Sequence, residues 1–512
     1  MKPNVSIIGA GHNGLVAAIV LARHGFKVDV FEDKNTVGGA AKTEYPFAKA
    51  PKLGTSSGAY LLGVMPPELI TRLGARLTLI RRDPHYFLPT TDHRYLLFGS
   101  DQEAMRAQFL KFFSEQDWKA NQALTREIGQ IRDDLAPSWM EEPLSLEETA
   151  EKYIRSELRS VFVNLVTRPV EEYLARFEFK SELVIAMYAV TDAFSGLNAS
   201  FGTPATGMNF LVHNMCRLPG SDGTWMIAQG GMGSITQELA RLAIEAGARI
   251  WTNAAAERII TDGGQVKSLL LKDGREVKTQ VVVSNADPYS MRDLVGQEKF
   301  PKPFNSKLDN FKRTGTTLKV NLALDRLPRF RCLPENRGQL NGTIHLFPQG
   351  DHIIQTIRDA YEQAKAGVLP DFPAIEFYIH TSVDPTLQDE KGRHNGAFFI
   401  QWAPYELKDK RWEDEEPRYV KHLLSIADQF APGFSDSVVD TFTLTPKKVE
   451  QHFGIRYGHI HHVDNTFGFD QRMPYATPIA GLYSCSAGCH PAGSVIGCAG
   501  HNAAMRVIKD LS

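Results

Sequence analysis

Near its start the chain reads VSIIGAGHNGLVAAIVLARHGFKVDVFE, residues 5–32. Residues 5–8 are β-branched or small and predict a short buried strand. Gly9, Gly11 and Gly14 follow in G-x-G-x-x-G spacing, and apolar residues then recur at helical intervals as far as Gly25. A second strand is expected over residues 27–31, and it ends at Glu32. A strand, a glycine turn, a helix, a strand and an acid in this order predict a dinucleotide-binding unit.

Each residue type in this unit has a physical role. Gly9 permits a tight turn, Gly11 lets the backbone approach a pyrophosphate at a helix N-terminus, and Gly14 lets helix and strand pack closely. Glu32 can accept hydrogen bonds from a ribose. Asn13, inside the motif, is counted with the predicted cofactor-binding residues. The bland alternative is a glycine-rich turn in an ordinary α/β unit.

A glycine pair follows the second strand, in VGGAAKTE at residues 37–44. Gly38 and Gly39 resemble the extended FAD fingerprint of glutathione-reductase-like and amine-oxidase-like flavoproteins. Many of these proteins have an Arg soon after the pair, whereas here Lys42 is the first cation, so a direct Arg–phosphate contact is not expected. A simple turn at the pair is the competing interpretation.

The middle of the chain is mostly helical in pattern between residues 60 and 215. At 229–234 the glycines return in QGGMGS, and Ser234 with Gln237 has the spacing of a capping box. Strands are then expected over residues 248–252, 265–271 and 277–284, joined by turn residues. The sequence has no second complete G-x-G-x-x-G unit and no redox C-x4-C pair, which argues against a separate nicotinamide domain and a disulfide reductase.

A third glycine set closes the chain, in YATPIAGLYSCSAGCHPAGSVIGCAGHNAA at residues 475–504. With GAGHNGLVAA (9–18), VGGAAKTE (37–44), GGMGS (230–234), VVVSNADP (281–288), VDPTL (383–387) and APYEL (403–407), it carries a family resemblance over nearly the whole chain. The sequence resembles the phytoene desaturase and amine oxidase-like superfamily of FAD flavoproteins. Within it, the sequence is most similar to the branch with pyridine nucleotide-disulfide oxidoreductase domain-containing protein 2 and the desaturase-like β-carotene ketolases.

The resemblance implies an α/β fold, in which a Rossmann-type, glutathione-reductase-like FAD-binding domain is interleaved with an α+β substrate-binding domain. It places FAD segments at 1–60, 221–296 and 475–512, and substrate segments at 61–220 and 297–474. It implies non-covalent FAD, held at its ADP part by Gly9, Gly11, Gly14 and Glu32. The remaining cofactor positions that it implies are Gly38, Gly39, Ala40, Ala256, Gly488, Ser494, Val495 and Ile496. All four glycine sets are expected to converge on this cofactor.

Two clusters, one of histidines and one of cysteines, are candidates for catalytic or metal-binding residues. In HIHHVD, residues 459–464, a strand would put His459 and His461 on one face near Asp464, as metal ligands, an acid–base pair or structural residues. The structural or substrate-lining role is favoured, and no metal site is predicted. Cys485, Cys489 and Cys498 lack a recognised redox spacing and are expected to pack. Trp225, Phe398, Phe399 and Trp402 are candidate walls of an apolar substrate cavity.

Composition narrows the function classes. Of 512 residues, 57 are Lys or Arg and 59 are Asp or Glu, which gives a net charge of −2 and no global basic field for nucleic acid. We expect a cytoplasmic FAD-dependent oxidoreductase, desaturating, oxidising or isomerising a polyene, isoprenoid or lipid-like substrate, with peripheral membrane contact left open. Oxygen or a quinone is the candidate electron acceptor, and the catalytic residues and oligomeric state stay unassigned. The alternatives are an amine-oxidase-like oxidase of a small molecule and a non-catalytic binder built on this fold.

Overall fold

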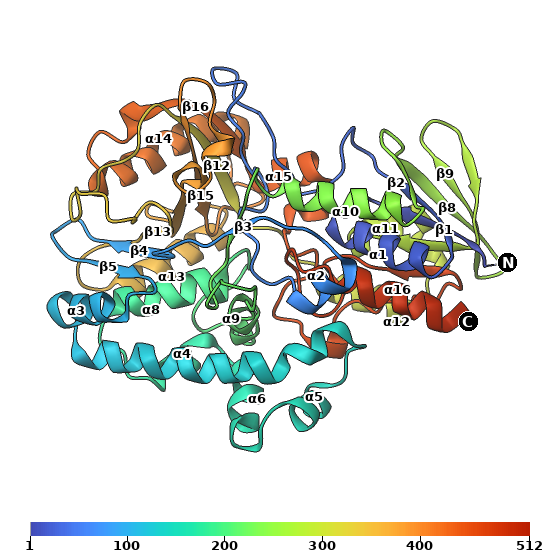
Figure 1. Ribbon diagram of the computed structural model, residues 1–512, viewed down its shortest axis with the longest axis horizontal. Coiled ribbons are helices and arrows are strands. Elements are labelled where there is room, and N and C mark those ends of the chain that lie inside the picture. Colours follow the sequence, from blue (N-terminus) through green and yellow to red (C-terminus); the bar gives the residue numbers. More distant parts are fainter. Residues whose placement is uncertain (1, 512) are drawn as a thin grey trace.

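The computed structural model describes residues 2–511 of the chain. Two sheets organise it (Figure 1). A parallel sheet with its helices forms one end of the molecule, where the first strand and the last helix lie together, and a mixed sheet forms the other end. The predicted α/β fold is confirmed.

The parallel sheet has five strands, and they come from three distant stretches of the chain. Their order across the sheet is β17 (Leu482–Ser484), β11 (Val281–Ser284), β1 (Asn4–Ile8), β2 (Lys27–Phe31) and β7 (Arg249–Trp251). The central strand β1 pairs in parallel with β2 and β11, as the apolar run at residues 5–8 predicts. Helix α1 (His12–Arg23) packs against α10 (Gly233–Glu245) and α16 (Cys498–Leu511), so elements from all three stretches share one core.

The stretch predicted as one returning strand, 277–284, is two strands. β10 (Glu276–Lys278) pairs with β9 (Gln265–Leu271), which pairs with β8 (Ala256–Asp262), in a small antiparallel sheet. The chain then turns at Thr279 and enters the parallel sheet as β11. The prediction missed this because no glycine, proline or asparagine separates the two halves in the sequence, and only the change of pairing partner does.

The start of α10 also differs from the prediction. Ser234 is not an N-cap, because the helix already begins at Gly233 and the Ser234 hydroxyl donates to the Gly231 carbonyl. The first N–H groups of the helix are satisfied from far away in sequence. Thr43 Oγ1 accepts from the Gly233 N–H at 3.1 Å, and Ser56 Oγ accepts from the Met232 N–H at 2.9 Å. Tertiary contacts therefore replace the local capping box.

The mixed sheet has seven strands. Its order is β16 (Val438–Leu444), β12 (Leu318–Leu324), β15 (His394–Ile400), β14 (Ile375–Tyr378), β13 (Thr343–Leu346), β4 (Tyr86–Pro89) and β5 (Tyr95–Phe98). The even-numbered residues of β12 share an apolar core with α14 (Trp412–Phe430). Since side chains alternate along a strand, Lys319 of β12 and Glu376 of β14 point to the opposite face.

Most of the remaining helices come from the helical stretch predicted in the middle of the chain. They are α3 (Gln102–Phe112), α4 (Glu115–Leu135), α5 (Leu146–Tyr153), α6 (Arg159–Thr167), α7 (Val170–Ala175), α8 (Glu182–Tyr188) and α9 (Thr206–His213). α2 (Pro67–Leu73) precedes them in the same stretch, and the helices outside it are α11 (Pro288–Val295), α12 (Lys302–Phe311), α13 (Ile353–Lys365) and α15 (Pro446–Phe453). The pair β3 (Leu79–Ile80) and β6 (Ile227–Ala228) completes the set.

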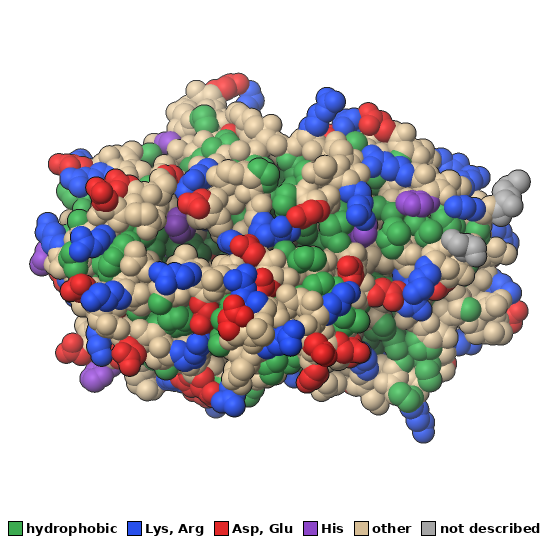
Figure 2. All heavy atoms as spheres, turned by 60° about the horizontal axis from the view of Figure 1, so that its bottom comes forward, with side chains coloured by type: hydrophobic (Ala, Val, Ile, Leu, Met, Phe, Trp, Pro, Cys, Tyr) green, Lys and Arg blue, Asp and Glu red, His purple; other side chains and the backbone are tan. Residues whose placement is uncertain are grey.

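The surface carries no field of one sign on the face in Figure 2. Basic and acidic side chains are interspersed there, which agrees with the near-zero net charge. Among residues 2–511, no helix is long and apolar enough to cross a membrane.

Candidate active site

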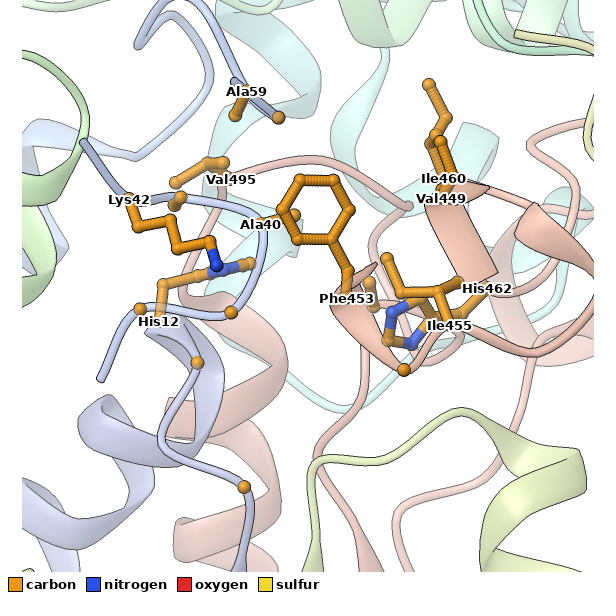
Figure 3. Close-up of a pocket in the computed structure, with 18 of the residues that line it drawn as sticks. His12, Ala40, Lys42, Ala59, Val449, Phe453, Ile455, Ile460, His462 and Val495 are labelled. Carbon is orange, nitrogen blue, oxygen red and sulfur yellow. The ribbon is translucent and has the colours of Figure 1, made fainter. Parts of the chain in front are cut away.

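A cavity of about 650 Å³ lies between the parallel sheet and the face of the mixed sheet that points away from α14. Its outer half is lined by the turn between β1 and α1, by residues 31–42, and by the start of β8. Its inner half is lined by side chains of β12, β14 and β15. Segment 449–462 and Val495 line the cavity too, and Figure 3 shows Phe453, His462 and Val495 around it.

The glycine turn is built for close approach at the outer half. Gly9 has a φ of +89°, which other residues rarely adopt, and a Cβ on Gly14 would lie 2.1 Å from the Gly9 carbonyl oxygen. The second distance is the helix–strand packing constraint that the motif predicts. Gly11 is the N-cap of α1, and no side chain caps the helix there. The first turn of α1 thus presents N–H groups toward the cavity.

Glu32 lies where the second strand ends, and it lines the cavity while 7% exposed. One carboxylate oxygen accepts from the Ala10 N–H at 2.8 Å, and the other accepts from the Lys34 N–H at 2.9 Å. The carboxylate is therefore fixed in place across the glycine turn. It keeps free lone pairs for further donors, which suits a ribose.

The predicted cofactor positions fall into two groups, those that line the cavity and those that lie behind its wall. The positions that line the cavity are Gly9, Gly11, Asn13, Glu32, Gly38, Gly39, Ala40, Ala256, Ser494 and Val495. Gly14, Gly488 and Ile496 lie behind this wall. Lys42 also lines it, but its ammonium pairs with Glu44 Oε1 at 2.9 Å. The glycines at 230–233 do not reach the cavity, because Gly231 and Gly233 pack against Thr43 instead.

The C-terminal loop is held by a buried arginine, Arg472. Its guanidinium donates to the carbonyls of Val463, Asp464, Phe467, Ala487 and Cys489 at 2.8–3.2 Å, and to Asn465 Oδ1 at 3.3 Å. Arg472 thereby joins residues 463–467 to the loop at 487–489. No motif in the sequence pointed to this residue.

The histidine cluster is not on a strand, so the predicted shared face of His459 and His461 is wrong. The segment is a series of turns, in which His462 has a φ of +61°. His459 Nε2 lies 3.3 Å from Asp464 Oδ2, whereas the His461 ring nitrogens lie 2.7 Å from the Gly493 carbonyl and 2.9 Å from the Ser195 carbonyl. The imidazole of His461 therefore bridges the C-terminal loop at Gly493 to the loop at Ser195, which is a structural role. Within residues 2–511 no group of three or more His, Cys, Asp or Glu side chains could hold a metal ion.

Unpartnered polar atoms test whether the outer half suits a dinucleotide. His12 Nε2 and Asn13 Oδ1 are buried in the first turn of α1 and have no hydrogen-bond partner among the described residues. Both residues line the cavity, and burial lowers the pKa of His12 to about 4, so its ring is neutral. An uncapped helix N-terminus beside a bare glycine turn and a fixed carboxylate fits the pyrophosphate and ribose of FAD.

The inner half holds charged groups that the sequence analysis missed. Arg82, Lys319 and Glu376 line it and are at most 4% exposed. Their neighbours on the wall include Tyr60, Leu61, Trp225, Tyr378 and Phe399. Of the four aromatic residues named from the sequence, Trp225 and Phe399 line the cavity. Phe398 and Trp402 are fully buried in the core, away from it. A lysine inside TLKVNLAL and a glutamate inside AIEFYI were visible signals, because a charge rarely interrupts a buried strand.

Burial shifts the titration of these groups toward neutral pH. Burial lowers the pKa of Lys319 to about 7, although Glu376 opposes that shift. Burial raises the pKa of Glu376 to about 7, against the hydrogen bond that the Tyr378 hydroxyl donates to it. The lysine and the carboxyl can therefore each hold or release a proton near pH 7. The three C-terminal cysteines are buried and free, and burial raises the pKa of Cys489 to about 11, which fits packing.

Residues 14–354 match the sequence pattern described as flavin containing amine oxidoreductase. The chain belongs to this family. It is 32% identical to the mouse pyridine nucleotide-disulfide oxidoreductase domain-containing protein 2, over the whole of this chain and 94% of the relative. It is 28% identical to the zeta-carotene-forming phytoene desaturase of Myxococcus xanthus, over 93% of this chain and 86% of that enzyme. The predicted superfamily is confirmed.

Solved structures support the fold. An oxidoreductase from Methanosarcina mazei superimposes with a TM-score of 0.64 at 16% identity, over 99% of this chain and all of the other. Putrescine oxidase bound to putrescine gives 0.61 at 17% identity, over 100% and 99% of the two chains. The family is flavin-containing, so the protein is an FAD-dependent oxidoreductase of the amine oxidase and phytoene desaturase type.

Proposed function

We propose that this protein binds FAD non-covalently in the outer half of the cavity and oxidises a substrate with an apolar body in the inner half. The observation that carries the proposal is the continuity of one cavity. It runs from the glycine turn and Glu32 to the wall of Tyr60, Leu61 and Phe399. Bound FAD supplies the hydride acceptor, flavin N5.

The residues of the chain contribute binding, orientation and proton exchange. Gly9, Gly11 and Glu32 would hold the ADP part, and Ser494 with Val495 would lie beside the flavin ring. Aromatic side chains of the inner half orient a C–H bond and exclude water. Glu376 can take up the proton that accompanies hydride loss, because burial raises the pKa of its carboxyl to about 7. The relative named as a phytoene desaturase supports an apolar substrate, and desaturation is the reaction that we favour.

An amine substrate is the second candidate. It is favoured by one observation, the buried carboxyl of Glu376 on the cavity wall, since a carboxylate can hold an ammonium group. The fold shared with putrescine oxidase is compatible with this reading.

Two measurements test the proposal. The purified protein should be yellow, and acid precipitation should release its flavin into the supernatant, which separates non-covalent from covalent FAD. Under anaerobic conditions, a panel of carotenoids, fatty acids and amines should include a class that bleaches the flavin. Protein without flavin would instead favour the non-catalytic binder, and flavin that nothing bleaches would remove the redox assignment.

A further inference from the structure

The inner half of the cavity contains two buried cations that lack a counter-charge. Arg82 is 3% exposed and Lys319 is 4% exposed, and among the described residues neither has a carboxylate within ion-pair distance. Taking a guanidinium or an ammonium out of water costs several kcal/mol unless acceptors replace the water, so such groups are normally paired. Two of them on one cavity wall are therefore an unusual feature.

Arg82 is held in place by two hydrogen bonds, but one of its terminal nitrogens has no acceptor. Its Nε donates to the Trp225 carbonyl at 2.9 Å, and Nη1 donates to Thr343 Oγ1 at 2.9 Å. The other terminal nitrogen, Nη2, has no acceptor within the part of the chain that the structure describes. The two bonds that exist fix the plane of the guanidinium, and the remaining edge is left for a group inside the cavity.

Lys319 is held by rings rather than by acceptors. Its ammonium lies 4.0 Å from the ring centre of Tyr60 and 4.5 Å from that of Phe399. The faces of aromatic rings attract a cation but accept no conventional hydrogen bond, so the ammonium keeps its donors available. The Tyr60 hydroxyl is also buried and lacks a partner in residues 2–511. Unpartnered donors therefore gather at this end of the cavity.

The nearby acidic groups do not balance this excess of donors. Glu376 influences both cations electrostatically, but one of its oxygens already accepts the Tyr378 hydroxyl, and Oε1 is the acceptor left over. Asp192 is held behind the wall by Asn214 and Tyr86. Burial shifts the pKa values of both carboxyls and of Lys319 to about 7, so at neutral pH each of these groups is partly neutral, whereas the Arg82 guanidinium stays charged. His213 and His345, whose pKa values burial lowers to about 3, add no positive charge.

We propose that the inner end of the cavity binds the carboxylate of a lipophilic organic acid at the free edge of the Arg82 guanidinium, with the Lys319 ammonium on the same cavity wall. The carboxylate supplies the acceptors that Arg82 and Lys319 lack, and Tyr60 donates to the same group. The apolar body of the acid lies along Leu61 and Phe399, toward the flavin side. This assignment rests on the proposed function for the place of the flavin, and it names the class of substrate.

The decisive measurement is equilibrium binding to the flavin-loaded protein by titration calorimetry. The probes are straight-chain acids from hexanoate to tetradecanoate, each compared with the alcohol and the primary amine of equal length. We expect an acid to bind at least about tenfold more tightly than its alcohol and its amine, a difference of about 1.4 kcal/mol. Equal or tighter binding of the amine, or no binding of any acid, overturns the proposal.

Variants locate the binding group. Arg82→Gln should weaken binding of the best acid by about tenfold or more, because the charge-assisted bonds are lost while two polar contacts can remain. Arg81→Gln is the matched control, since Arg81 adjoins Arg82 but pairs at the surface with Asp222 at 3.2 Å, and it should leave the dissociation constant unchanged. An unchanged constant in Arg82→Gln contradicts the proposal. If that variant does not fold, Lys319→Met and the wild-type probe series give the same decision.

Binding and redox activity can fail separately. Protein that binds the acid without any bleaching of its flavin loses the proposed function and keeps the carboxylate site. Protein whose flavin is bleached by amines, and which ignores acids, loses the carboxylate site and keeps the oxidoreductase.

Discussion

The two ends of the active-site region each contain a buried arginine, and the two guanidinium groups differ in whether all their nitrogens have hydrogen-bond acceptors. Every nitrogen of the Arg472 guanidinium donates to oxygens of the C-terminal loops, with no gap left for a ligand. Arg82 has one edge without an acceptor, and Lys319 beside the same cavity has only aromatic rings around its charge. A buried cation whose donors all have acceptors in the protein stabilises the fold. A buried cation with donors left over marks a binding place for a ligand. Stability measurements can separate the two cases.

The largest effect is expected for Arg472→Met. The change leaves several buried carbonyl groups without donors, and it should lower the free energy of unfolding by about 4 kcal/mol or more. Denaturant unfolding and flavin content measure it, and flavin should be lost because the loop at 487–489 is released. The exposed Arg275, paired with Asp273 at 2.8 Å, gives the matched control Arg275→Met, which should keep both. A stable, yellow Arg472→Met protein would break the comparison.

Lys319→Met should change the free energy of unfolding in the opposite direction, toward greater stability. Replacing an unpaired buried ammonium with an apolar side chain of similar length should raise the free energy of unfolding by about 1–3 kcal/mol at pH 6. The folded pKa of about 7 lies below the ordinary value of 10.5, so the penalty of the charge is complete below pH 7. The wild type gains stability as the pH rises from 7 toward 10.5, and the advantage of the variant fades over that range.

Denaturant midpoints at pH 6 and pH 9 measure the effect. A loss of stability in Lys319→Met at pH 6 would show that the protein already satisfies this ammonium. Flavin bleaching by an acid substrate should slow in the same variant, because the Lys319 ammonium then no longer contributes to holding the carboxylate.

A smaller gain with the mirror-image pH dependence is expected for Glu376→Gln. The folded pKa of about 7 lies above the ordinary 4.5, so the penalty of the ionised carboxyl is complete above pH 7 and absent below pH 4.5. The gain should be about 1 kcal/mol at pH 8, reduced because the amide removes the carboxyl nearest to both cations. Thermal unfolding at pH 4.5 and pH 8 tests this. An advantage that is larger at pH 4.5 than at pH 8 would contradict the assigned direction.

The smallest effect is expected for Arg81→Gln. Its ion pair with Asp222 is exposed, so its loss should change the free energy of unfolding by no more than about 0.5 kcal/mol. The measurement is the denaturant midpoint in 0.1 M and 1 M salt, where the small difference should vanish at high salt. A change as large as that of Lys319→Met would mean that burial does not separate the two classes of cation.

The sequence was sufficient for the first strand–turn–helix–strand unit of the chain because that unit depends on short-range constraints. The spacing of Gly9, Gly11 and Gly14 dictates a turn, a close packing contact and a bare helix start, and all three are present. The strand at 27–31 has the predicted bounds. Charged residues at the ends of these strands and of the helix, and glycines at their turns, indicate where each element begins and ends.

The substrate side could not be derived in the same way. Arg82 reaches the cavity only because Trp225 and Thr343, more than 140 residues further along the chain, receive its bonds. The histidine segment takes its turns around Gly493, where a Cβ would lie 2.4 Å from His461 Cβ. The same holds for one element at the parallel-sheet end, because the start of α10 depends on Thr43 and Ser56. In each case a distant partner overrides a local pattern. Lys319 and Glu376 were the exceptions, since a charge within an apolar strand can be read without knowing the fold.

The order of the parallel sheet has a consequence for biosynthesis. β1 is the central strand, and its neighbour β11 follows about 270 residues later in the chain. At a translation rate of about 5–20 residues per second, one edge of β1 waits roughly 15–50 seconds for its partner. During that time an apolar strand edge is open to pairing with other chains, which is a hazard for aggregation. Soluble yield should therefore fall when general chaperones are withheld during synthesis.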